Sequence, residues 1–318
     1  MTISKQPRRR SRRKSRFKSE LDDLVRGLCG GFLFGIPMLY TMEVWWIGSA
    51  SAPSRLIVVL ISTLICTYLL SRTAGFRKAQ AAREREAVGD AVEAIALGLI
   101  CATFMLIVIQ QVTFNTRLSE ALGKIVLESV PFSLGVALSN QLLQESDDKE
   151  NQEGAKKKGF KPGSASASPQ SAGSNSLSKR FMPKGNLNET LADIGATLIG
   201  SAVIAFSIAP TDEVAVLVTA MHGPWLVLMV LISVVLSYGI VFQANFTRQG
   251  QRLLQKGLFQ QPISETIFSY LISLLAAALM LGFFRQIDPG APWDLTFRQI
   301  VVLGLPATIG GAAGRLAL

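Results

Sequence analysis

Six acidic residues lie inside, or at the edge of, long apolar stretches of this 318-residue sequence: Glu43, Glu93, Glu128, Asp193, Glu213 and Glu265. A charged side chain at the centre of a bilayer costs about 2.5–3.5 kcal/mol on insertion scales, so it normally faces a polar interior and often belongs to an ion or proton pathway. Glu128 is the most deeply placed, because Asp193 and Glu213 lie near the ends of their stretches and can reach water. We therefore take Glu128, the Glu93/Glu265 pair and Glu43 as candidate residues of an ion or proton pathway.

Each of these acids also has a purely structural interpretation. Glu128 follows Lys124 by four residues, so the two side chains share one helix face and can form an ion pair. Two prolines leave a similar choice open. Pro131 and Pro306 each remove a backbone donor, and the carbonyl that is freed either lines a cavity and coordinates a cation or accompanies a plain kink, which is the simpler interpretation.

Motifs of enzymatic chemistry are missing from the sequence. The single histidine, His222, has no partners at metal-ligand spacing, and there is no G-x-S-x-G elbow, Walker A loop or Rossmann fingerprint. The three cysteines, Cys29, Cys66 and Cys101, stand in apolar runs, as is typical of small core residues. The sequence therefore predicts no enzyme, no cofactor and no metal site.

The composition indicates what positions these residues. Apolar residues make up 49% of the chain and charged residues only 17%, against about 25% in a soluble domain. Eight stretches approach the roughly 20 residues that a helix needs to cross a bilayer. They cover residues 27–47, 56–73, 90–112, 121–143, 190–210, 224–243, 265–284 and 299–317. We expect an all-α, polytopic bundle of about eight membrane-spanning helices.

The net charge of +10 is concentrated in one segment, because residues 1–19 hold nine Lys or Arg and no acid. Such a run can bind nucleic acid, but directly before a hydrophobic span it more typically fixes the cytoplasmic side and attracts anionic lipid headgroups. Counted over all loops, 27 of the 32 basic residues fall on one side. The positive-inside rule thus predicts that both termini and the linker lie in the cytoplasm, and we expect no nucleic-acid partner.

Sequence matches at a nearly constant offset predict that the membrane portion consists of two duplicated halves. Residues 59–62 (VLIS) recur at 230–233, Glu43 corresponds to Glu213 at an offset of 170, and Glu93 corresponds to Glu265 at 172. The segment IVLESVPFSLGVALS (125–139) aligns without gaps to IVVLGLPATIGGAAG (300–314). We expect a basic disordered tail (1–20), a four-span repeat (21–143), a disordered cytoplasmic linker (144–188) and a second repeat (189–318). With four spans each, the copies run parallel, related by a pseudo-two-fold axis along the membrane normal.

Small residues at helical spacing predict how the helices pack. Gly27, Gly31 and Gly35 form one flat stripe on the first span. Helices in lipid associate largely through close backbone approach, so tight packing is the better interpretation and a groove for a substrate is the alternative.

The run RGLCGGFLFGIPMLYTMEVWWIG (26–48), with AGFR (74–77), GDAVEA (89–94) and KIVLESVPFSLG (124–135), resembles a family of uncharacterised bacterial integral membrane proteins. The resemblance implies a multi-span inner-membrane protein and no activity. From the duplication and the intramembrane acids we expect a small transporter or channel for an unknown ion or solute, with its pathway between the halves. The alternative is a non-transporting scaffold or sensor that docks partners through its tail and linker.

Overall fold

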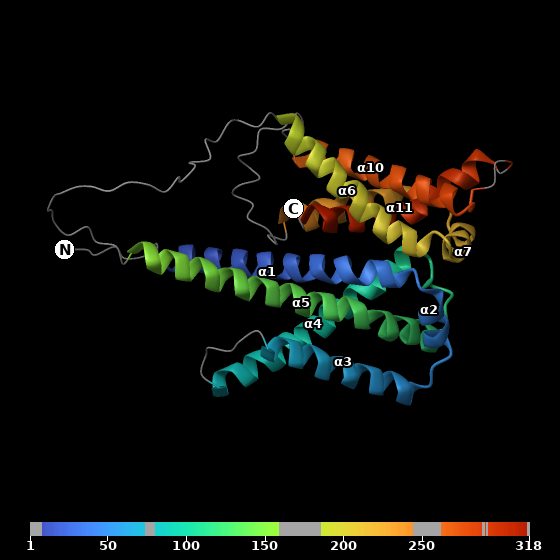
Figure 1. Cartoon of the computed structure of the whole chain (residues 1–318). Helices are drawn as coiled ribbons and strands as arrows, with labels where there is room; N and C mark the ends of the chain where they lie inside the picture. The colour runs from blue at the N-terminus through green and yellow to red at the C-terminus, as the bar shows by residue number, and fades with distance from the viewer. Residues whose placement is uncertain are drawn as a thin grey trace, which may run out of the picture.

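The computed structural model describes residues 8–73, 80–158, 186–243, 262–287, 290 and 292–316. Every regular element in these ranges is a helix and none is a strand, so the all-α prediction is confirmed (Figure 1). The helices before the linker are α1 (Arg8–Leu39), α2 (Met42–Ser49), α3 (Pro53–Thr73), α4 (Gln80–Val108) and α5 (Leu118–Lys158). Those after it are α6 (Asn186–Ile208), α7 (Glu213–Ala220), α8 (Gly223–Tyr238), the π-helix η1 (Gly239–Gln243), α10 (Pro262–Phe283) and α11 (Trp293–Leu316).

Seven of the described helices are long and apolar enough to cross a membrane, and α1 and α2 together would make an eighth span. The first apolar stretch, expected to be one span over 27–47, is broken: α1 ends at Leu39 and α2 turns away from it by 88°. The indole N–H of Trp45 donates to the carbonyl oxygen of Leu39 at 2.7 Å. Because the last carbonyls of a helix have no partner within it, this bond stabilises the end of α1 at the bend.

Two helices extend furthest beyond the stretches expected from the sequence. α5 continues to Lys158, so residues 144–158 of the expected linker are helical, and α1 begins at Arg8 within the expected tail. Both ends lie on the left in Figure 1, opposite α2 and α7. The rest of the linker up to residue 185, and residues 1–7, lie outside the described residues.

The two halves contain the same order of elements: a long helix, an eight-residue helix, two spans and a last long helix. α4 and α10 also end alike. Gln110 and Arg285 are left-handed (φ 61° and 57°), and the next residue in each case, Gln111 or Gln286, donates its backbone N–H to a carbonyl five residues back. This is the hydrogen bond of a Schellman cap, in which glycine is the usual left-handed residue.

Glycines let the first and last helices of each half approach closely. A Cβ atom on Gly135 of α5 would collide with the carbonyl oxygen of Gly30 in α1, and one on Gly310 of α11 would collide with that of Gly200 in α6. The stripe of Gly27, Gly31 and Gly35 lies against α5, and Gly27 and Gly31 also face α4.

One apolar core connects the two halves. α1 contacts α4 and α5 on one side and α11 and η1 on the other. Phe32 and Ile36 of α1, Ile240 of η1 and Val302 of α11 belong to the same buried cluster. α1 therefore makes most of the packing between the halves, and α4 also packs on α8.

Candidate functional site

Glu128 is fully buried on α5, and neither of its carboxylate oxygens has a hydrogen-bond partner among the described residues. One turn later, Phe132 packs where Gly35 of α1 lacks a side chain. One turn earlier, the backbone of Lys124 lies against Gly48 of α2. Residues four apart share a helix face. Glu128 therefore faces α1 and α2 at the level of the bend between them.

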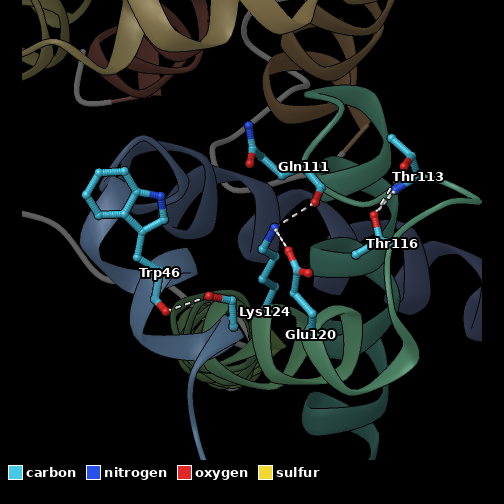
Figure 2. Close-up of polar contacts among 7 residues, drawn as sticks. Trp46, Gln111, Thr113, Thr116, Glu120 and Lys124 are labelled. Carbon is cyan, nitrogen blue, oxygen red and sulfur yellow. Dashed lines mark hydrogen bonds and ion pairs between the residues drawn. The ribbon is translucent and has the colours of Figure 1, made fainter.

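The ion pair considered for Glu128 from the sequence is made by another acid. The Nζ atom of Lys124 lies 2.7 Å from Oε1 of Glu120 and donates to the carbonyl oxygen of Gln111 at 3.1 Å (Figure 2). In the same loop, the hydroxyl of Thr116 accepts a hydrogen bond from the backbone N–H of Thr113. Lys124 thus fixes the turn between α4 and α5, and its interactions are directed away from Glu128.

α5 has further polar groups near Glu128. The hydroxyl of Ser133 is buried, lies against Gly98 of α4 and has no partner in the described parts of the chain. Pro131 has no N–H, so it cannot donate to the carbonyl of Leu127. Buried polar groups are normally hydrogen-bonded, so the unpartnered ones on this segment of α5 make it the candidate site. Ser133 was not singled out by its sequence context, because a single serine in an apolar run is unremarkable.

The carbonyl freed by the second proline is used to join the halves. Pro306 cannot donate to the carbonyl of Val302, and the hydroxyl of Tyr40, at the end of α1, donates to that oxygen at 2.6 Å. The bond is buried and joins residues of the two different halves. At Pro306, therefore, the freed carbonyl has a protein donor.

The structure places Glu93 and Glu265 in unlike surroundings. Glu93 is exposed on α4. Glu265 of α10 forms an ion pair with the buried guanidinium of Arg315 in α11. Arg315 also donates to the hydroxyl of Ser269 at 3.1 Å and lies 5.7 Å from the centre of the Phe242 ring. Arg315 thereby connects α10, α11 and η1.

We expect Glu265→Ala to lower the free energy of unfolding by about 3–5 kcal/mol, because it leaves the buried charge of Arg315 without its carboxylate. The control is Glu93→Ala, at an exposed glutamate of α4, where a change within about 0.5 kcal/mol is expected. Denaturant unfolding of the purified protein in detergent measures both. Equal effects of the two substitutions would show that the ion pair with Arg315 has no structural importance.

Glu43 and Glu213 lie on the two short helices, and their exposure differs. Glu43 is exposed near the start of α2, whereas Glu213, at the start of α7, is only 7% exposed. Burial raises the pKa of Glu213. The nearby charges of Glu43 and Asp212 add to the increase, whereas the backbone N–H groups of Glu213 itself and of Met42 oppose it. Its position near the end of an apolar stretch predicts that Glu213 can reach water, whereas the structure buries it.

Among the described residues no three His, Cys, Asp or Glu side chains are grouped so that they could hold a metal ion.

Comparison with known proteins gives the family. A family model described as "Putative integral membrane protein (DUF2391)" matches residues 23–318. Neither the curated proteins nor the solved structures contain a match. The match covers every candidate acid and begins after the basic segment 1–19. The chain therefore belongs to the DUF2391 family of integral membrane proteins.

Proposed function

We propose that the protein is a small transporter or channel that moves a cation or proton through a pathway between two duplicated halves. The observation that carries the proposal is Glu128, a fully buried carboxyl group with no partner among the described residues. Such a group is costly within a membrane helix and is found where it contacts an ion or a proton. The proposed substrate is a cation or proton because a carboxylate is negatively charged and binds either.

Corresponding contacts in the two halves support the duplication. Gly30 packs on Gly135 as Gly200 packs on Gly310, and the sequence offsets are 170 and 175. The left-handed caps at Gln110 and Arg285 also differ by 175. Parallel repeats of this kind form transporters whose site lies where the repeats meet. α1 fits that position, because Glu128 faces its end and Tyr40, at the same bend, reaches the second half.

The other acids suggest where the pathway would open. Glu43 lies at the α2/α7 end of the molecule, and Glu265 lies toward the opposite end, at the start of α10. Glu93 is retained as a candidate at the start of its span, where its exposed side chain can meet ions before they enter. We infer from the distribution of basic residues that this second end is cytoplasmic in a bacterial inner membrane, with residues 1–19 against anionic lipid headgroups.

Proteoliposomes containing a pH-sensitive dye test the proposal directly. Under an imposed membrane potential, the wild-type protein should carry a proton or cation current above that of empty vesicles. Replacing Glu128, Glu93 and Glu265 with glutamine should abolish it, because the amide cannot bind the charge. Asp22→Asn, an exposed change near the start of the membrane portion, is the control and should leave the current intact. A current that survives the three substitutions would refute the assignment of these acids.

A scaffold or sensor is the second candidate, and one observation favours it. α1 has 32 residues and α5 has 41, whereas about 20 suffice to span a bilayer. The excess lies at one end of the molecule, where it can dock a partner (Figure 1). Deleting residues 1–19 or 150–180 should then remove the cellular phenotype, whereas a transporter that still inserts would keep its flux.

A further inference from the structure

Glu128 lies beside a break in the first membrane-spanning segment. One turn after it on α5, Phe132 packs at Gly35 of α1. One turn before it, the backbone of Lys124 lies against Gly48 of α2. Glu128 is therefore level with the chain between these two glycines, where α1 ends and α2 turns away by 88°. α5 packs against both of these helices.

The broken end of α1 supplies oxygen atoms at this level. The last four carbonyl groups of a helix have no donor within it, and in α1 these belong to residues 36–39. Two of them are used locally, by the indole of Trp45 and by the backbone N–H of Thr41. The other two belong to Ile36, which is fully buried, and Pro37. The partial negative charge of the helix dipole is concentrated at the same end, which favours a cation there.

The carboxylate of Glu128 brings one negative charge to this place. The side chain is fully buried, and neither oxygen has a hydrogen-bond partner within the described ranges. Lys124, one turn away, is paired with Glu120 instead. A lone carboxylate among apolar groups is neutralised by one positive charge, whereas a divalent ion would leave an excess positive charge buried. The site therefore suits a monovalent ion.

We propose that Glu128 and the carbonyl groups at the end of α1 form a binding site for one dehydrated alkali-metal cation. Carbonyl oxygens can replace the water around such an ion, and the C-terminal ends of discontinuous helices coordinate ions in transporters built from repeats. Tyr40, at the break, donates to the carbonyl of Val302 in the second half, so the site lies next to a contact between the halves. The inference rests on the proposed function, for which it names the ion as an alkali-metal cation rather than a proton.

Equilibrium dialysis of the purified full-length protein in detergent against radioactive Na⁺ tests the site without requiring transport. The wild-type protein should bind about one Na⁺ per chain, because one carboxylate neutralises one charge. Glu128→Gln should abolish this binding, whereas the exposed control Asp22→Asn should leave it unchanged. Competition with unlabelled Li⁺ and K⁺ should reveal a preference among the three ions, because the site replaces their water; a carboxylate that meets them through water would not discriminate.

Thermal unfolding at constant ionic strength supplies a second readout and shows that the variants are folded. Replacing choline with the preferred ion should raise the Tm of the wild type and of Asp22→Asn but not that of Glu128→Gln, because a ligand stabilises the state that binds it. Binding that survives Glu128→Gln, or a wild-type protein that binds none of the three ions, would overturn the proposal. In the second case, a current that still depends on Glu128 would keep the proposed function, with a proton as the transported ion. Binding without any current would keep the site and refute transport.

Discussion

Replacing Glu128 with leucine should make the protein more stable and at the same time inactive. The carboxyl group is fully buried without a partner among the described residues, and such a group costs about 1–3 kcal/mol in desolvation. The proposed duplication aligns Glu128 with Leu303, which is also fully buried, so an apolar side chain of similar size should suit this position. We expect Glu128→Leu to increase the free energy of unfolding by about 1–3 kcal/mol.

The reciprocal substitution is the control. Leu303→Glu should lower the free energy of unfolding by at least as much, because it buries a new carboxyl in apolar surroundings. Denaturant unfolding in detergent measures both variants. A clear loss of stability in Glu128→Leu would show that the carboxyl supports the fold, and the functional assignment would then lose its main support.

Gly200→Ala should largely prevent folding of the second half, whereas Gly195→Ala on the same helix should be harmless. A Cβ atom at Gly200 would collide with the backbone of Gly310 and Gly314 in α11, which cannot move as a side chain can. At Gly195 nothing lies within 4 Å of the same atom. Overpacking costs about 1–3 kcal/mol or more. In the open position, alanine gains up to about 1 kcal/mol through its better helix propensity.

The folded yield in size-exclusion chromatography and the unfolding free energy of the recovered protein measure this difference. Gly310→Ala should repeat the defect, because it faces the carbonyl oxygen of Gly200 from the other side. Similar yields for the changes at positions 195 and 200 would contradict the close approach of α6 and α11.

The spans were largely predictable because hydropathy depends on local composition, and the described helices follow the apolar stretches closely. The break after Leu39 was not predictable. It is associated with a hydrogen bond from the side chain of Trp45 to the backbone carbonyl of Leu39. A hydropathy profile does not show where the axis of a helix changes direction. The helical extension to Lys158 was missed because its polar composition also suits a linker.

The burial of Glu128 was predictable from the sequence, but the ion-pair partners of the charged residues were not. Glu128 is as buried as its position suggested, yet Lys124 has an acid four residues away on either side, and spacing alone cannot show that Glu120 is the one it binds. The partner of Glu265 is 50 residues away on another helix. Only the fold brings Arg315 to it, so the sequence favoured a symmetric pair where the structure has one exposed acid and one ion pair.

The most direct test of the central claim is the voltage-driven proton or cation current through vesicles that contain either the wild-type protein or Glu128→Gln. Equal insertion of the two proteins is checked first, by protease protection and by the amount recovered from the vesicles. The burial of Glu128 predicts a wild-type current above that of empty vesicles and a variant current that falls to the background. A variant that carries the wild-type current, or a wild-type protein that carries none, would contradict the role assigned to Glu128.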